Sequence, residues 1–343
     1  MSYASLFIFT IGLAASMVVM PALAENAADH PFADKKVMIN VGSAPGGGYD
    51  AQARLMGRYL GRHIPGHPNV IVQNIPGAGG LVAANGFYNM GARDGSAIAL
   101  LQRTAVTARA LIGENVHFDV TKFNWLGSLA SEPGVLLAKR NVPVEKAADL
   151  MKMQLIVGGA GAANDSELTP KVINAVIGTQ LKIVSGYKSI TAVTLAMEQG
   201  EVQGVTDLSL SNVKRNPNLL AEGNARVLMQ FSLERDRDLP DIPTPLEFAK
   251  NDADKKLLAL YLSPKAVARP VALPPGVAPA TIAMMRKAFM EMTADADFLA
   301  EAEKLSIPID AADHKIVERV IAIVNEAPEE AVKRLRGIIG GGL

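Results

Sequence analysis

Two glycine-rich bends near the start of the chain combine the residue types that suit the binding of a small anion. The first reads PGGGYD over residues 45–50, and the second reads PGAGG over residues 76–80. Each follows a predicted strand and opens a predicted helix, so unpaired backbone N–H groups and the positive end of a helix point to the same place. The close succession of the two bends predicts a pocket that holds a carboxylate between two loops.

The acid at the end of the first bend has a local role in this interpretation. Asp50 can cap the helix and pair with Arg54, four residues further along. A carboxylate here would repel an anionic ligand, so we expect Asp50 to fix the loop rather than to touch the ligand. The second bend carries no acid, which leaves its amides free to donate.

Polar residues at the ends of other predicted strands are further candidates for ligand contact. Arg103 and Thr104 come directly after the strand predicted at 96–101, where parallel strands present their ends to a crevice. Arg103 could clamp a carboxylate with two hydrogen bonds, or it could lie on the surface. Tyr187 and Asp207 also follow predicted strands, and each could face the cleft or satisfy local backbone groups.

The stretch QLIVGGAG at 154–161 has some likeness to a dinucleotide-binding fingerprint, but the match fails at two places. Asn164 stands where a third small residue is needed for helix packing, and the strand that ends at Ser185 lacks the acid that would hold a ribose. The better interpretation is a loop that donates amide and hydroxyl groups, with Asp165 or Ser166 as the cap of the following helix.

Residues for catalysis or metal binding do not assemble in the sequence. The chain has no cysteine and no GxSxG elbow, and its glycine loops lack the Gly-Lys followed by Ser or Thr of a P-loop. His63 and His67 are four apart, but Pro65 and Gly66 between them deny the helix that a zinc pair would need. We therefore expect no cofactor, no metal and no enzymatic activity.

Composition and the first residues favour an exported protein. Lys plus Arg and Asp plus Glu both number 34 among 343 residues, which argues against a nucleic-acid surface or a broad anionic-membrane surface. Residues 1–24 carry no charge and end in Ala22-Leu23-Ala24, which predicts a cleavable secretory signal, with an uncleaved anchor as the alternative. An exported chain without cysteine has no disulfides, so its stability must come from the size of its core.

The elements that must hold these residues alternate between strands and helices. Strands are predicted at 36–41, 70–73, 96–101, 134–139, 154–157, 182–184 and 202–205, and helices near 50–60, 80–90, 145–151, 166–177 and 189–199. This alternation indicates α/β layers with largely parallel sheets. Prolines then interrupt the pattern, and we expect helices to resume only after Pro279. The first of these has a core-facing stripe of Ile282, Met285, Phe289 and Met292.

The motifs of the chain, in their order and spacing, resemble those of the substrate-binding receptors of tripartite tricarboxylate transporters, also called the Bug receptor family. The resemblance spans nearly the whole chain after residue 24. The motifs that carry it are PGGGYD (45–50) with Ala53-Arg54, NIPGAGG (74–80), RDGS (93–96), FD (118–119), FNWLG (123–127), GYK (186–188), GEVQG (200–204), LPDIPT (239–244) and PPGV (274–277).

The resemblance implies an α/β, two-lobed periplasmic binding protein fold, type II-like, with a ligand cleft between the lobes. Domain I is expected to comprise 33–128 and 231–343, and domain II 129–230, with hinge crossings near 129–135 and 229–232. The protein is expected to work as a monomer. By position, the residues that inherit contact with a ligand carboxylate are Ser43, Gly46, Gly47, Gly48, Tyr49, Ala78, Gly79 and Gly80.

The second lobe is expected to contact the rest of the ligand. This chain departs from the family pattern at Ser189, where glycine is common, and at Gln203, where an acid is common, so the identity of the acid stays open. The expected function is a periplasmic receptor that captures a small organic acid for membrane permease subunits. Two alternatives are an exported enzyme that uses the amide loops as an oxyanion site, and a ligand-sensing partner of a membrane sensor.

Overall fold

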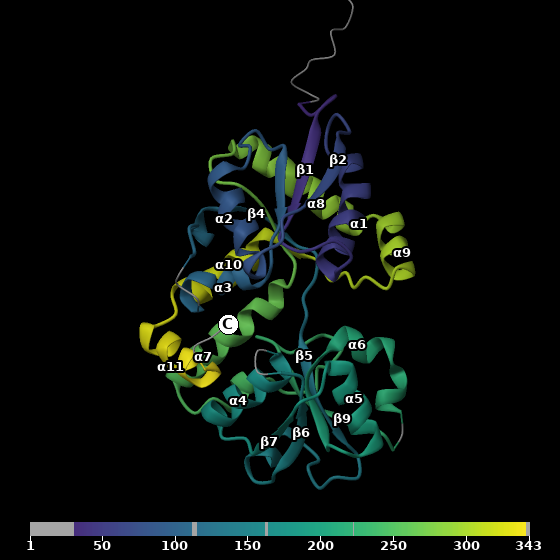
Figure 1. The fold of residues 1–343 in the computed structure, drawn as a ribbon, viewed down its shortest axis with the longest axis vertical. Helices are drawn as coiled ribbons and strands as arrows, with labels where there is room; N and C mark the ends of the chain where they lie inside the picture. The colour runs from purple at the N-terminus through teal and green to yellow at the C-terminus, as the bar shows by residue number, and fades with distance from the viewer. Residues whose placement is uncertain (1–30, 112–114, 162–163, 222, 341–343) are drawn as a thin grey trace, which may run out of the picture.

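The computed structural model describes residues 31–111, 115–161, 164–221 and 223–340, and Figure 1 shows them as two α/β lobes, one above the other. The predicted two-lobed fold is therefore confirmed. The predicted secretory signal at 1–24 lies outside the described residues.

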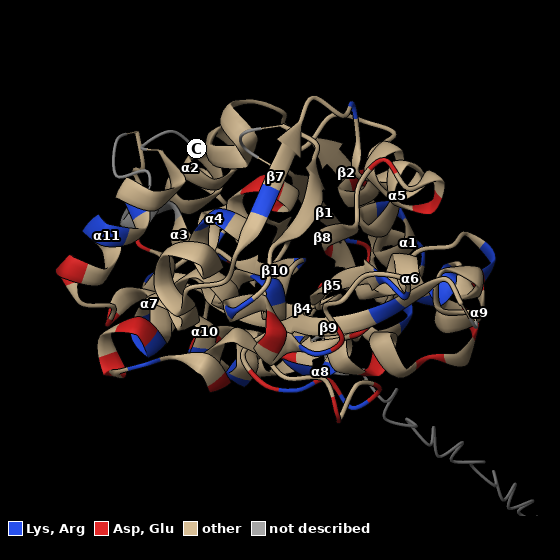
Figure 2. Ribbon diagram, turned by 90° about the horizontal axis from the view of Figure 1, so that it is seen from below, with Lys and Arg blue, Asp and Glu red and all other residues tan. Residues whose placement is uncertain are grey.

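The charged residues of both signs are interspersed over the ribbon in the view of Figure 2, in keeping with the formal neutrality of the chain. Within the described ranges, no helix has the length and apolar composition that crossing a bilayer requires.

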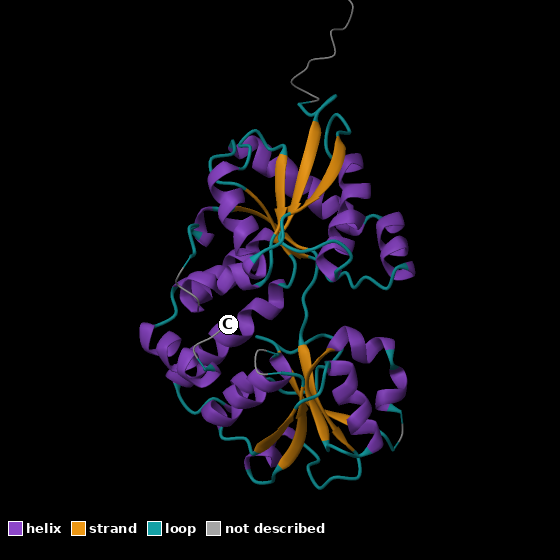
Figure 3. Ribbon diagram, in the orientation of Figure 1, coloured by secondary structure: helices purple, strands orange, loops and turns teal. Residues whose placement is uncertain are grey.

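The upper lobe is built on a six-stranded mixed sheet (Figure 3). Its strands are β1 (Lys36–Val41), β2 (Asn69–Asn74), β3 (Ala97–Leu100), β4 (Asn124–Ser128), β10 (Pro270–Leu273) and β11 (Ala312–Asp313), in the order β11-β4-β10-β3-β1-β2. β1 pairs in parallel with β2 and β3, as predicted, but β10 runs antiparallel to both β3 and β4. The chain returns from the lower lobe to insert β10 into the middle of this sheet, which no local pattern signals.

Helices cover the two faces of the upper sheet. They are α1 (Gly48–His63), α2 (Leu81–Met90), α3 (Thr104–Leu111), α8 (Pro279–Ala294), α9 (Ala296–Lys304) and α10 (His314–Asn325), with short 3-10 segments at Ala78–Gly80 and Val120–Lys122. The predicted core stripe of α8 is confirmed, because Met285, Phe289 and Met292 are buried and Ile282 packs against the same cluster. Gly127 of β4 makes room for this stripe, since a Cβ there would lie 2.5 Å from the Phe289 ring.

The lower lobe has a five-stranded mixed sheet in the order β7-β6-β8-β5-β9. Its elements are β5 (Gly134–Lys139), β6 (Leu155–Gly159), α4 (Asp165–Ile177), β7 (Leu181–Ser185), α5 (Ile190–Gln199), β8 (Gly204–Ser209), α6 (Leu210–Arg215) and β9 (Ala225–Phe231), with 3-10 segments at Ala147–Met151 and Pro217–Leu220. β5 runs antiparallel to β8 and β9, so the expectation of largely parallel sheets was wrong here too. Asp207 lies within β8 rather than after a strand, because β8 begins and ends later than predicted.

The proline-rich third of the chain contains a helix that the sequence analysis did not predict. After the 3-10 segment η5 (Pro245–Phe248), α7 (Asp252–Leu262) buries Leu257, Leu258, Leu260 and Leu262, so the expectation that helices resume only after Pro279 was wrong. The prolines flank α7 and do not interrupt it. α7 packs against α4 of the lower lobe and against α11 (Glu329–Ile339).

The stretch between β9 and β10 therefore touches both lobes, and one continuous cluster of buried residues joins them. This cluster runs through Trp125 and Ala272 of the upper sheet, Val317 and Val320 of α10, Leu257 and Leu258 of α7, Val172 and Ile173 of α4, and Val157 of the lower sheet. The predicted domain limits and hinge crossings stay a prediction.

Phe289→Ala should lower the free energy of unfolding by about 3–5 kcal/mol, because it removes a buried ring and leaves a cavity. Urea unfolding followed by circular dichroism measures this effect. Lys287→Ala on the same helix, with a side chain 76% exposed, is the matched control and should change stability by less than about 0.5 kcal/mol. Equal effects of the two substitutions would contradict the placement of this face of α8 in the core.

Candidate functional site

Two adjoining hollows lie between the lobes. The first, of about 500 Å³, places Gly46, Gly47 and Gly48 of the upper lobe opposite Ser209, Ser211, Asn212 and Arg215 of the lower lobe, and we call it the glycine-loop hollow. The second, of about 260 Å³, is lined by Arg103, Asn164, Asp165, Ile190, Asp207 and Lys265, and we call it the ion-pair hollow. Glu132, Ser209 and Asn212 line both, so the two hollows form one cleft.

The glycine loop is fixed from behind by Asp50. The N–H of Gly46, which has a φ of +87°, donates to Oδ2 of Asp50 over 2.8 Å. The same carboxylate accepts from Arg54 Nε over 3.0 Å and from Asn74 Nδ2 over 2.9 Å. The prediction that Asp50 fixes the loop and pairs with Arg54 is confirmed. The prediction that it caps the helix was wrong, because α1 begins earlier, at Gly48, and Asp50 lies within its first turn.

The N-terminus of α1 is uncapped by any side chain. Its N-cap residue is Gly47, which has no side chain to accept a hydrogen bond. The amides of the first turn lack intrahelical acceptors and carry the positive end of the helix dipole. Because Gly47 and Gly48 line the hollow, this positive end opens onto it.

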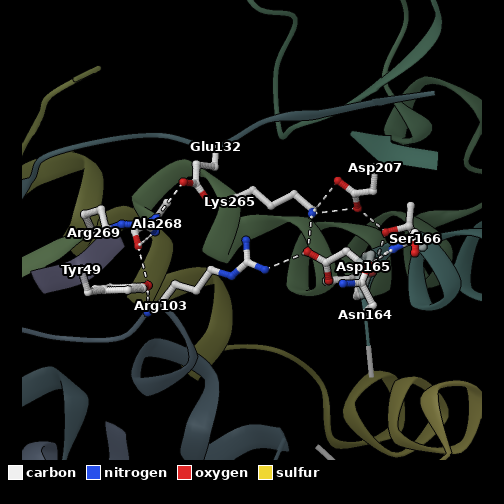
Figure 4. A network of polar contacts seen from close by, with 12 residues as sticks. Tyr49, Arg103, Glu132, Asn164, Asp165, Ser166, Asp207, Lys265, Ala268 and Arg269 are labelled. Carbon is white, nitrogen blue, oxygen red and sulfur yellow. Dashed lines mark hydrogen bonds and ion pairs between the residues drawn. The ribbon is translucent and has the colours of Figure 1, made fainter. Parts of the chain in front are cut away.

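Tyr49 anchors the loop to the segment that leads into β10 (Figure 4). Its hydroxyl donates to the Ala268 carbonyl over 2.8 Å and accepts from the Arg103 N–H over 3.1 Å. The Arg269 guanidinium lies 4.1 Å from the centre of the Tyr49 ring and pairs with Glu132 over 2.9 Å. The Tyr49 hydroxyl thus bonds to the protein's own backbone, and its predicted contact with a ligand stays a prediction.

The second glycine bend does not line either hollow. Gly77, Ala78, Gly79 and Gly80 all have positive φ angles, and a Cβ on Gly80 would lie 2.4 Å from Gln102 Cγ. Thr104, another predicted ligand contact, donates to the Gly79 carbonyl over 3.4 Å. The structure thus places Thr104 against the second bend, whose last residue, Gly80, lies close to Gly42, just before the first bend. Contact of Ala78, Gly79 and Gly80 with a ligand stays a prediction.

Four charged side chains from four parts of the chain form a network across the cleft (Figure 4). Arg103 of the upper lobe pairs with Asp165 of α4 over 2.7 Å. Lys265, on the 3-10 segment η6 (Ser263–Val267) that follows α7, pairs with Asp165 over 3.2 Å and with Asp207 of β8 over 2.8 Å.

The network continues behind Asp207 into the protein. Thr169 of α4 donates to Asp207 and also shares a hydrogen bond of 2.7 Å with the hydroxyl of Tyr261 on α7. Asp207 holds a left-handed backbone conformation, with a φ of +60°, which is uncommon for a residue other than glycine. Arg103, Asp165 and Asp207 were predicted at the cleft from sequence, and the structure brings all three into the ion-pair hollow.

Burial and pairing act against each other on the pKa values of this network. Burial disfavours the ionised form of Asp165, but Lys265 and Arg103 outweigh it and lower the pKa of Asp165 to about 2. Burial likewise disfavours the charge of Lys265, yet the carboxylates of Asp207 and Asp165 keep its pKa above the ordinary value. Burial raises the pKa of Asp207, against the attraction of Lys265.

The cap of α4 differs from the prediction. Asn164 is the N-cap, and its Oδ1 accepts from the Ser166 N–H over 3.0 Å. Asp165 is the first helical residue, and Ser166 Oγ instead accepts from the Ala160 N–H over 2.9 Å. The prediction of Asp165 or Ser166 as the cap was wrong, because the short amide side chain of Asn164 reaches the free N–H two residues further on.

Two further predicted residues have roles within their own lobes. The Tyr187 hydroxyl donates to Glu201 over 3.3 Å, and Tyr187 lines neither hollow. The Ser43 carbonyl accepts from Asn74 over 3.0 Å, whereas its hydroxyl oxygen is buried without a hydrogen-bond partner. Contact of Tyr187 or Ser43 with a ligand stays a prediction.

Comparison with known proteins identifies relatives of the chain. The model of the tripartite tricarboxylate transporter family receptor matches residues 61–313. The chain belongs to this family.

Relatives of this receptor are distant in sequence and similar in fold. It is 22% identical to a UPF0065 protein of Bordetella pertussis, over 68% of this chain and 72% of that protein. A TctC solute-binding protein from Polaromonas superposes with a TM-score of 0.68 at 18% identity, covering 90% and 98% of the two chains. A protein of R. palustris, solved with adipate, gives a TM-score of 0.53 at 19% identity, covering 89% and 97%. The resemblance drawn from the sequence motifs is confirmed.

Four charged cleft residues of the receptor were missed by the sequence analysis, namely Glu132, Arg215, Lys265 and Arg269. Lys265 and Arg269 lie in the stretch before Pro279 where prolines were expected to interrupt the pattern of strands and helices. Lys265 is only 5% exposed, and a buried lysine with acidic partners is the type of feature that marks a site. No local pattern reveals that burial, because both of its partners are distant in sequence.

Lys265→Met should lower the free energy of unfolding by about 3–5 kcal/mol, because it leaves Asp207 buried without a counter-ion. Urea unfolding of the single and double variants measures this. Lys265→Met combined with Asp207→Asn should recover much of the loss, since the uncompensated charge is then gone. Strictly additive losses in the double variant would contradict the direct coupling of the two groups.

Asp165→Asn should destabilise the receptor by about 2 kcal/mol at neutral pH and by almost nothing near pH 2. The folded-state pKa of Asp165 is lowered from 3.8 to about 2, so its ionised form stabilises the fold above its ordinary pKa. That contribution is lost as the pH falls from about 4 towards 2. Unfolding midpoints of the wild type and the variant over this range measure the difference, and a gap independent of pH would contradict this assignment.

Proposed function

We propose that this receptor is a periplasmic solute-binding protein that holds the carboxylate of a small organic acid in the glycine-loop hollow and delivers the acid to membrane permease subunits. The observation that carries the proposal is the uncapped N-terminus of α1, which opens onto a hollow between the two lobes. The structure of the R. palustris protein with adipate supports it, since adipate is a small organic acid.

The proposed cycle needs closure of the lobes and no chemistry on the ligand. We place the hinge at the crossing near 129–135, between β4 and β5, and at the crossing near 229–232, at the end of β9, with domain I at 33–128 and 231–343 and domain II at 129–230. The receptor acts as a monomer after removal of the signal at 1–24. It needs no cofactor, binds no nucleic acid and is not an enzyme, in keeping with relatives described as solute-binding and periplasmic binding proteins.

The available interactions are sufficient for useful affinity. Micromolar binding requires roughly 8 kcal/mol. A charge-assisted hydrogen bond contributes about 1.5–3 kcal/mol, and a favourable helix end about 0.3–2 kcal/mol. A few amide donors at the start of α1, together with the guanidinium of Arg215 across the hollow, reach this value after the entropy of association is subtracted.

Gly47→Asp should abolish acid binding and leave the fold intact. Gly47 is at the N-cap with a φ of −84° and has open space around a Cβ, so an aspartate fits there and caps α1 with its own carboxylate. A thermal-shift screen over organic acids first identifies a ligand, and calorimetry then compares the variants. We expect a loss of more than about a hundredfold, since several charge-assisted hydrogen bonds are replaced by repulsion.

Gly47→Asn is the matched control, because it caps the helix equally well without a charge and should bind the acid more tightly than Gly47→Asp does. Gly79→Asp tests the second bend in the same assay. A loss of affinity in Gly79→Asp but not in Gly47→Asp would show that the carboxylate binds at the second bend. Unchanged affinity in both aspartate variants would overturn the proposal.

A further inference from the structure

The charges that line the cleft are nearly balanced before any ligand enters. The two hollows are lined by four cationic side chains, Arg103, Arg215, Arg269 and Lys265, and by three carboxylates, Glu132, Asp165 and Asp207. The charge of a ligand must be compensated by the free charges of the cleft, because an uncompensated charge in a partly buried site is unfavourable.

Three of the four cations already have acidic partners. Arg103 pairs with Asp165 over 2.7 Å, and Arg269 pairs with Glu132 over 2.9 Å. Lys265 lies between Asp165 and Asp207. A ligand carboxylate at these cations would therefore share their positive charge with a carboxylate of the protein.

Arg215 is different from the other three cations. Its guanidinium donates to Asn212 Oδ1 and to the Ser306 carbonyl, and no acid among the described residues lies within ion-pair distance of it. Ser306 follows α9 of the upper lobe, so Arg215, at the end of α6, reaches across the cleft beside the glycine loop. The uncompensated positive charge of the cleft is therefore concentrated in the glycine-loop hollow, where α1 also presents its positive end.

The ion-pair hollow has the opposite character. Asp165 and Glu132 are partly accessible, with side chains 29% and 22% exposed, and ionised carboxylates only accept hydrogen bonds. The start of α4 lies at this hollow, and it is capped by the side chain of Asn164 and carries the acids Asp165 and Glu167 in its first turn. In α1, by contrast, no side chain caps the helix, and the first-turn acid Asp50 does not line the glycine-loop hollow. A second carboxylate placed here would face these acids, whereas an N–H or O–H donor would find acceptors.

We infer that the receptor's ligand carries one carboxylate and, at its far end, a hydrogen-bond donor such as an amide, hydroxyl or ammonium group, rather than a second or third carboxylate. This inference rests on the proposed function, since it places the single carboxylate at Gly46–Gly48 and Arg215. The donor end then lies against Glu132 and Asp165.

Calorimetry with matched probes tests the inference. The probes are succinate, glutarate and adipate, each compared with its monoamide and with its ω-amino analogue of the same chain length, at neutral pH and up to high millimolar concentration. We expect the monoamide or the ω-amino acid to bind at least about tenfold more tightly than the diacid of equal length. The second carboxylate of the diacid would be repelled by Glu132 and Asp165, whereas an amide or ammonium group would donate to them. Tighter binding of the diacid in every series would overturn the inference.

Substitution of Asp165 should reverse the expected preference for the monoamide over the diacid. Asp165→Asn frees Arg103 from its carboxylate, so diacid binding should improve at least about tenfold relative to monoamide binding. Glu318→Gln is the matched control, since Glu318 also pairs with an arginine, Arg286, but lines neither hollow. An equal change in preference in both variants, or none in Asp165→Asn, would contradict the assigned role of Asp165.

The outcomes separate this inference from the proposed function. Should a diacid be preferred and Gly47→Asp abolish its binding, the carboxylate site stands and the inference fails. Should a preferred monoamide bind to Gly47→Asp and to Arg215→Gln as tightly as to the wild type, the carboxylate lies elsewhere, and the inference and the proposed function both fail. Absence of binding by all probes over the full concentration range would also contradict both, because the hollow would then not be a carboxylate site.

Discussion

The arrangement of the cleft depends on one interaction, the pairing of the Lys265 ammonium group with the carboxylates of Asp165 and Asp207. A buried charge without partners is strongly unfavourable, so the segment that carries Lys265 must stay against α4 and β8 of the lower lobe. The same segment leads directly into β10 in the middle of the upper sheet. The two ion pairs of Lys265 thus connect the two lobes at the back of the cleft, and Arg103 adds a further connection through Asp165.

The ion pairs of Lys265 and Arg103 limit which groups of the cleft remain free to bind a ligand. Because Arg103, Lys265 and Arg269 are paired with the protein's own carboxylates, we propose that an anion is held by backbone amides at the start of α1 and by Arg215. Backbone donors are fixed by the loop and cost little entropy to organise. Asp50 and Asn74 hold that loop from behind without facing the hollow. The cleft is therefore polarised, with its positive end at the glycine loop and its acceptor groups at the other end.

The fold alone would not have revealed this polarity. The receptor superposes well on a Polaromonas relative with which it shares 18% identity, so the architecture persists while most side chains differ. Function in such a family lies in the few side chains that line the cleft and in how they pair. Here the pairing leaves Arg215 as the cation without an acidic partner among the described cleft residues, and from this difference we infer a ligand with a single carboxylate.

The sequence alone determined the alternation of strands and helices, the two glycine bends and the family, because these depend on local patterns and on glycine at positions of positive φ. Only the tertiary structure decided that Asp165 meets Lys265, a hundred residues away, and that the second bend lines neither hollow. It also decided that α7 forms between prolines and that β10 enters the upper sheet antiparallel. The physical reason is that helix and strand preferences act over a few residues, whereas charge pairing and strand insertion depend on where the whole chain brings distant segments together.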